Sequence, residues 1–212
     1  MGRLISLSDG IFAFSMTLLV ISLALPTIRS AGTGPDLFTY LRQLEPALLS
    51  YVVAFLVIST WWLGHHRIFS AIRKYDLLLM RLNTMMLLVI SISPFMLAIV
   101  FQYGPSSIFV TSLSAKVAVA LFAAVEVVTG LILLAIWRHA TRDHHLVDPK
   151  LSAEWIQYAE NLTVRPTVVF AAAIAVALVN PWLAEIGWVA VLFVRRSRGK
   201  GPTSPAATPA PR

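Results

Sequence analysis

The sequence predicts an all-α integral membrane protein with six transmembrane helices, and three observations support that fold class. Hydrophobic residues make up 58% of the chain and charged residues only 13%, whereas soluble domains carry about 25% charged residues. Apolar runs approaching the ~20 residues that cross a bilayer recur along the chain, and its mean hydropathy is +0.77. Basic residues gather in alternate connections between these runs. Water is therefore not the main solvent of this chain.

The first two helices are expected at about residues 4–25 and 46–70. Pro26 ends the first run, and the Gly/Pro/Ser-rich stretch 30–35 that follows cannot continue a helix. A cleaved signal peptide is disfavoured because Asp9 interrupts the run and no small-x-small cleavage site follows. In the second helix the apolar face continues beyond the run, through residues at helical spacing. These residues are Trp62, His65, His66 and Phe69.

The remaining four helices are expected at about 81–101, 113–137, 164–179 and 182–194. Pro94 falls inside the third, as a kink that neighbouring membrane helices tolerate. The segment 138–165 holds four acids, three histidines and a proline, so a polar loop or amphipathic connection is expected there. Only Asn180 and Pro181 separate the last two helices, which predicts a tight hairpin or one broken helix.

These helices form one predicted transmembrane domain, residues 1–196, followed by a tail at 197–212. The tail consists mainly of Pro, Ala, Ser and Thr, and it is too poor in large apolar residues to offset its ordering entropy. We expect it to be disordered and cytoplasmic.

The basic residues predict the orientation, with the N- and C-termini both cytoplasmic. Six spans place fourteen of the seventeen Lys and Arg residues on one side, as the positive-inside rule requires. The other side keeps Arg29, Arg42 and Lys116. The net charge of +7 is thus explained by topology and by contact with anionic lipid headgroups in the bilayer, and nucleic-acid binding is not expected.

The first helix has one continuous stripe of mainly apolar residues. At about 100° per residue, a single face collects every third or fourth residue. This face comprises Gly10, Phe14, Thr17, Leu18, Ile21 and Leu25. Asp9 lies about 140° from Phe14, so it faces into its own subunit, where a carboxylate inside a span needs hydrogen-bond donors.

Candidate donors for Asp9 lie at the same depth on the second and third helices. One hypothesis is a network in which Ser8 and Asp9 bond to Trp62, to His65 or His66, and to Asn83, which would hold the first helix upright. The alternative is that Asp9 caps the first helix near the headgroups, since Ser and Asp satisfy free N-terminal amides well. The residues alone leave both interpretations open.

Several motifs together resemble the transmembrane protein 175 family of potassium channels. The first is Arg3-x-x-x-Leu7-Ser8-Asp9 and the Ala-x-x-x-Thr-Leu-Leu-Val helix that follows it. Trp62-x-x-His65-His66, the Leu-Asn pair ending at Asn83, and the Pro-Trp hairpin at residues 181–182 are also similar. The resemblance touches most of residues 3–194.

The resemblance implies a passive potassium channel in the cell membrane of a prokaryote, a homotetramer of six-helix subunits with the first helix of each lining the axis. Potassium would be the permeant ion, with no cofactor. Thr-Val-Gly-Tyr-Gly is absent from the sequence, so no carbonyl selectivity-filter loop is expected. The family places bulky apolar layers and a nearby Thr layer on the first helix. The predicted pore-lining residues are accordingly Phe14, Thr17, Leu18, Ile21 and Leu25, with Arg3 in the bracing motif.

Two positions depart from the family pattern. Leu7 replaces the Phe of the motif and should change the packing near the cytoplasmic end of the first helix. Phe14 replaces the usual Ile or Leu at the first constriction, and its larger ring should affect conductance and selectivity more than the fold.

The sequence also allows rival interpretations. The stripe on the first helix also suits packing against lipid or other helices, and the Ala-rich runs 118–124 and 171–173 suit a non-conducting membrane scaffold. Glu126, in the middle of the fourth helix, suits either a proton-coupled transporter or a neutral group bonded to a neighbouring helix.

Metal and enzyme chemistry are not expected. His65-His66 and His144-His145 are adjacent pairs that split around a helix, and the chain has no cysteine. No hydrolase, metalloprotease, Walker or dinucleotide motif occurs in the sequence.

Overall fold

The computed structural model describes residues 2–22, 37–104, 109 and 111–194. This part of the chain folds into six α-helices and two 3₁₀ segments, without a β-strand. The α-helices are α1 (Gly2–Leu18), α2 (Leu37–Ala71), α3 (Leu77–Tyr103), α4 (Leu113–Thr141), α5 (Ala153–Val179) and α6 (Pro181–Val194), and the 3₁₀ segments are η1 (Leu19–Ser22) and η2 (Arg142–His144).

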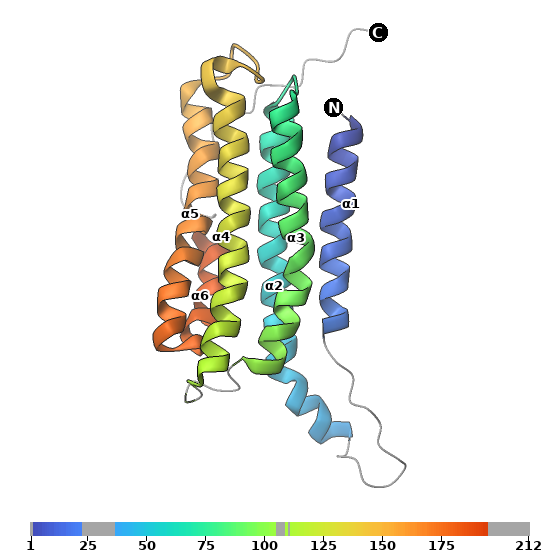
Figure 1. Cartoon of the computed structure of the whole chain (residues 1–212), viewed down its shortest axis with the longest axis vertical. Coiled ribbons are helices and arrows are strands. Elements are labelled where there is room, and N and C mark those ends of the chain that lie inside the picture. Colours follow the sequence, from blue (N-terminus) through green and yellow to red (C-terminus); the bar gives the residue numbers. More distant parts are fainter. Residues whose placement is uncertain (1, 23–36, 105–108, 110, 195–212) are drawn as a thin grey trace.

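The helices run up and down in one elongated bundle (Figure 1). Within the described residues, five stretches are long and apolar enough to cross a membrane, namely Gly2–Ile21, Ala47–Ala71, Leu77–Tyr103, Leu113–His144 and Ala153–Val179. The described part of the sixth helix, α6, has 14 residues, about 21 Å at 1.5 Å per residue, which is less than the ~30 Å hydrocarbon core. The chain is an all-α, multi-pass integral membrane protein.

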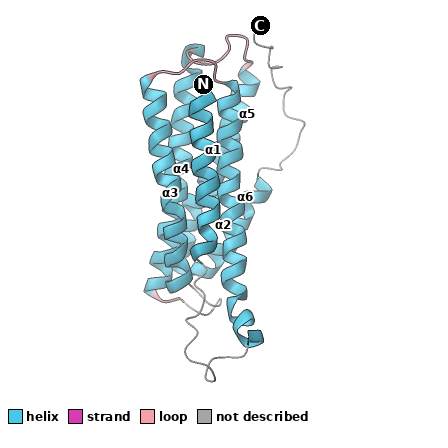
Figure 2. Cartoon of the chain, turned by 90° about the vertical axis from the view of Figure 1, so that its right-hand side faces the viewer, coloured by secondary structure: helices cyan, strands magenta, loops and turns pink. Residues whose placement is uncertain are grey.

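Helix α1 lies at the edge of the bundle (Figures 1 and 2). Among the described elements it contacts α2, α3 and its own continuation η1. In contrast, α4 is central, since it packs against α3, α5, α6 and α2. One side of α1 consequently has no partner among the described elements.

Helix α5 begins at Ala153, earlier than the expected start at 164. Ser152 Oγ accepts a hydrogen bond from Trp155 N at 3.2 Å and so caps the helix. Trp155 and Ala159 are buried on the inner face, and the acids of this stretch lie on the outer one. The expected polar loop or amphipathic connection over 138–165 is therefore shorter than predicted, because residues from 153 onward form the amphipathic first part of α5.

Other helix bounds differ by smaller amounts. The second and third helices begin earlier than expected, at Leu37 and Leu77, and α4 continues to Thr141. Pro94 lies inside α3, as expected. The α-helical part of the first helix ends at Leu18 and tightens into η1. The expected end of that helix at Leu25 and the predicted tail lie outside the described residues.

Asp76 joins two connections at one end of the bundle. Its Oδ1 accepts from Leu79 N at 2.8 Å and caps α3, and its Oδ2 lies 2.8 Å from His139 Nε2 and 3.6 Å from His145 Nε2. Nearby, Arg73 N donates to Leu146 O at 2.7 Å. The Leu79 amide, followed by His139, holds the pKa of Asp76 below its ordinary value, while desolvation acts in the opposite direction.

We expect Asp76→Ala to lower the free energy of unfolding by about 0.5–2 kcal/mol, the usual contribution of an N-cap. Because the folded-state pKa of Asp76 is depressed, its contribution is present above the ordinary pKa and is lost as the pH falls through the depressed one. Thermal unfolding in detergent between pH 7 and pH 3 measures both effects. Asp76→Asn, which can still cap α3, should lose less stability at pH 7; equal losses in the two variants would contradict the capping role.

Candidate pore face and helix-bracing network

Helix α1 and its continuation η1 have one buried and one exposed face. Ser8, Phe12, Ser15 and Leu19 are at most 1% exposed, and their spacing of three or four residues places them on the side that meets α2 and α3. The opposite side exposes Leu7, Gly10, Phe14, Thr17 and Ile21. We call this set the α1 outer face.

The residues predicted to line a pore lie mostly on the α1 outer face. Phe14 is 64% exposed and Ile21 is 73% exposed, while Leu18 is half-buried. Leu25 lies outside the described residues. Thr17 Oγ1 donates to Phe14 O at 2.8 Å, so the lone pairs of this hydroxyl remain available on the exposed side.

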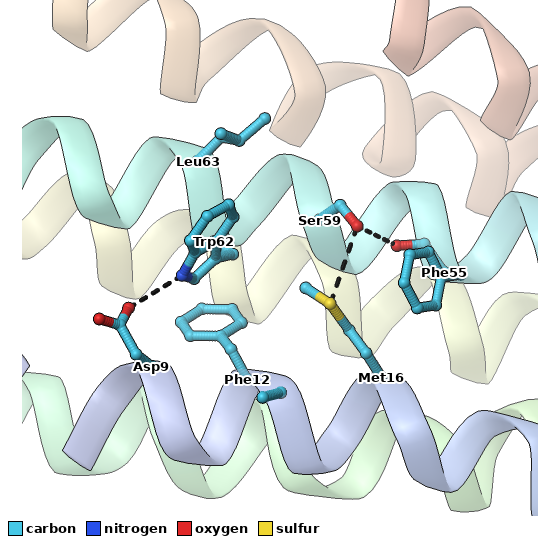
Figure 3. Close-up of a pocket in the computed structure, with 8 residues that line it drawn as sticks. Asp9, Phe12, Met16, Phe55, Ser59, Trp62 and Leu63 are labelled. Atoms are coloured by element: carbon cyan, nitrogen blue, oxygen red, sulfur yellow. Dashed lines mark hydrogen bonds between the residues drawn. The ribbon is translucent and has the colours of Figure 1, made fainter. Parts of the chain in front are cut away.

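Asp9 points away from this face and toward α2. Trp62 Nε1 donates to Asp9 Oδ1 at 2.9 Å (Figure 3). Since α1 begins at Gly2, Asp9 lies inside the helix, and the alternative that it caps the N-terminus is wrong. An indole N–H on a carboxylate is a charge-assisted hydrogen bond, which is stronger than a bond between neutral groups.

A second polar connection joins α1, α3 and α2 through Asn83. Asn83 Nδ2 donates to Ser8 Oγ at 3.1 Å, and Asn83 Oδ1 lies 2.9 Å from His65 Nε2. Ser8 Oγ donates in turn to Leu4 O at 3.0 Å. Ser8, His65 and Asn83 are all 0% exposed. Because the Asn83 oxygen accepts, the proton is assigned to His65 Nε2.

His65 is further held by aromatic contacts. Its ring stacks on Phe69 at a centroid distance of 4.0 Å and lies 5.6 Å from Phe12. Its Nδ1 is buried and has no hydrogen-bond partner in the described part of the chain. This environment favours a neutral imidazole, because a second N–H here would be a buried donor without an acceptor.

Two residues of the predicted network stand outside these bonds. His66 is exposed, and its ring lies 5.9 Å from that of Trp62. Arg3 is exposed on α1 and forms no ion pair with a described residue. The side chains that hydrogen-bond one another are therefore Ser8, Asp9, Trp62, His65 and Asn83.

A groove of about 500 Å³ separates α1 from α2 beside these bonds. Its lining is Asp9, Phe12, Ala13, Met16, Phe55, Ser59, Trp62 and Leu63. Figure 3 shows Asp9 and Trp62 at one end, and Met16 facing Ser59 further along. Ser59 Oγ lies 3.8 Å from Met16 Sδ and donates to Phe55 O at 2.8 Å. The groove is mainly apolar, with its one carboxylate held by an indole.

Comparison with known proteins agrees with this fold. Residues 3–94 match the model of a family described as the endosomal/lysosomal potassium channel TMEM175. A protein of Streptomyces collinus named as a potassium channel is 36% identical over 152 residues, which cover 72% of this chain and 70% of the relative. The chain belongs to the TMEM175 family.

A further relative and a solved structure extend the similarity over most of the chain. A potassium channel of Chamaesiphon minutus is 26% identical over 193 residues, covering 91% of this chain and 90% of the relative. The crystal structure of a lysosomal potassium-selective channel TMEM175 homolog from Chamaesiphon minutus superposes with a TM-score of 0.76 at 25% identity, covering 91% of this chain and 95% of that one. The family and the fold are those of ion channels rather than of enzymes.

Proposed function

We propose that this chain is the subunit of a homotetrameric channel that conducts potassium passively through a pore lined by α1. The support is the α1 outer face: an edge helix of a membrane bundle that exposes Phe14, Thr17 and Ile21 while its other side is buried. Two relatives are named as potassium channels. For this reason we assign potassium conduction to the α1 outer face.

Around a fourfold axis, each residue of the α1 outer face becomes a ring of four. Rings of Phe14 and Ile21 would form hydrophobic constrictions that block ions by dewetting until the helices separate. The Thr17 hydroxyl oxygens, whose lone pairs remain available beside Phe14, would replace part of the hydration shell of a potassium ion. Opening in this scheme is a dilation of the four α1 helices.

The bracing bonds keep α1 in the orientation that this scheme needs. Asp9 and Ser8 are tied to Trp62 and Asn83 on the inner side, so rotating α1 to hide Phe14 would break both bonds. The bond to Trp62 also keeps the Asp9 carboxylate turned toward the bundle and away from the proposed axis.

We further propose that both termini face the cytoplasm of a prokaryotic cell and that the protein resides in its plasma membrane. In support, the bundle end formed by the start of α1, the α2–α3 connection and the α4–α5 connection carries most of the described basic residues. Arg73, Lys74, Arg142 and Lys150 lie in or beside these connections.

Potassium and sodium flux into liposomes containing the purified protein tests this function. We expect the wild type to pass potassium faster than sodium. We expect Phe14→Ala to increase the potassium flux, because a constriction formed by four smaller side chains fills with water more readily. Val168→Ala is the matched control, since Val168 is exposed on α5, away from α1. If the wild-type protein, Phe14→Ala and Thr17→Ala all fail to conduct, the scaffold interpretation is favoured. Proton-dependent, saturating uptake lost in Glu126→Gln would favour the transporter.

A further inference from the structure

Two adjacent tryptophans of α2 hold carboxyl groups of two different helices, α1 and α4. Trp62 Nε1 donates to Asp9 on α1 at 2.9 Å, and Trp61 Nε1 donates to Glu126 Oε2 on α4 at 2.7 Å. Successive residues of a helix point about 100° apart, so a rotation of α2 that moves one indole also moves the other.

Glu126 is enclosed on all sides. It is 0% exposed, and its second oxygen, Oε1, accepts from Ser93 Oγ of α3 at 3.2 Å. It forms no ion pair with a described residue. One carboxyl group therefore joins α2, α3 and α4, and the enclosure favours a fixed bond over proton transfer to solvent.

Trp61 has little freedom to move away from Glu126. It is 1% exposed, and its ring lies 6.4 Å from that of Phe170 on α5. A Cβ added at Gly130 would lie 2.8 Å from Trp61 Cη2, which shows how closely α4 approaches this indole. The bond to Glu126 and this packing together fix the rotation of α2 about its axis.

We propose that Glu126 is a positioning residue for α1, acting through the Trp61-Trp62 pair. A rotation of α2 by about 20°, at a side-chain radius of about 6 Å, moves an indole by about 2 Å, which is enough to break the bond between Trp62 and Asp9. Loss of Glu126 would therefore release α1 although the two residues do not touch. The inference rests on the proposed function only in giving α1 the role of pore helix.

Substitutions at Glu126 separate positioning from proton chemistry. Gln has the same shape, and its amide oxygen can accept from Trp61 while its NH₂ donates to Ser93 Oγ. Leu removes both acceptors. We expect Glu126→Gln to behave like the wild type and Glu126→Leu to behave like Trp62→Phe, which removes the bond to Asp9 directly.

The test combines potassium flux with the reactivity of a thiol on α1. The chain has no cysteine, so Thr17→Cys alone reports the exposure of α1 to a water-soluble thiol reagent, whether or not the protein conducts. In this background we expect Glu126→Leu and Trp62→Phe each to change the labelling rate about tenfold, in line with the loss of a buried hydrogen bond. We expect the double variant to change it no further. Phe122→Leu, a buried change on α4 beside Trp188 of α6, should leave the rate unchanged.

Three results would overturn the proposal. The first is additive effects of Glu126→Leu and Trp62→Phe on the labelling rate, and the second is a labelling rate that Glu126→Leu does not alter. The third is a change of the labelling rate in Glu126→Gln as large as in Glu126→Leu. The same flux assay detects failure of the channel function separately. A wild type that does not conduct removes the pore role of α1, whereas the labelling rates still decide whether Glu126 positions this helix.

Discussion

Gly130→Ala is expected to destabilise the bundle by about 1–3 kcal/mol or more, the cost of overpacking a core. A Cβ at this position would overlap Thr167 Oγ1 and would lie 2.8 Å from Trp61 Cη2 and 3.0 Å from Thr167 Cβ. Neither neighbour can yield easily, because Thr167 bonds to its own helix through Thr163 O at 2.8 Å and Trp61 is bonded to Glu126. Small residues at such crossings let membrane helices approach closely.

The measurement is the midpoint of thermal unfolding in detergent, with tryptophan fluorescence as the probe of unfolding. Gly187→Ala is the matched control, since a Cβ at that helical position would meet nothing within 4 Å, and Ala has the higher helix propensity. A Gly130→Ala protein that is as stable as the control would contradict the close approach of α4, α5 and Trp61.

Asn83→Leu is expected to reduce both stability and potassium flux. Its amide is the one side chain through which α3 bonds to both Ser8 of α1 and His65 of α2 among the described residues. Leu would leave the His65 N–H buried without an acceptor, a cost of about 1–3 kcal/mol. Ser8 loses less, because it still donates to Leu4 O. Freed from α3, α1 should no longer hold the proposed pore geometry.

Thr84→Leu provides the control on the same helix, because Thr84 is exposed and bonds within α3 to Met80 O at 2.9 Å. Unfolding midpoints and liposome flux should both remain near wild type in Thr84→Leu. Equal losses in the two variants, or an Asn83→Leu protein with normal stability, would show that the amide does not brace α1.

Helical periodicity was enough to predict which residues of α1 lie on its exposed face and which side of the helix carries Asp9. The period that groups Phe14, Thr17 and Ile21 also separates them from Asp9, and the structure exposes the first three while Trp62 holds the fourth. Depth alone suggested Trp62, His65, His66 and Asn83 as neighbours of Asp9. The sequence could not select among them, because the choice depends on how α2 and α3 are rotated.

Other features depended on tertiary contacts that no local pattern reveals. The start of α5 was missed because Glu154 and Glu160 occupy its outer face, where Arg138 pairs with Glu160 at 2.6 Å. The partners of Glu126 come from two other helices, at sequence separations that form no motif. Likewise, nothing in the neighbouring residues marks Gly130 as a close-contact position.

Single-cysteine accessibility tests the pore role of α1 most directly, because the native chain has no cysteine. Phe14→Cys, Thr17→Cys and Phe95→Cys would each be treated with a charged, water-soluble thiol reagent during potassium flux. Phe95 on α3 is the matched control, since it is 64% exposed in the single chain, as is Phe14. We predict block at positions 14 and 17 and none at 95. Block at position 95 with unaffected flux at 14 and 17 would contradict a pore lined by α1.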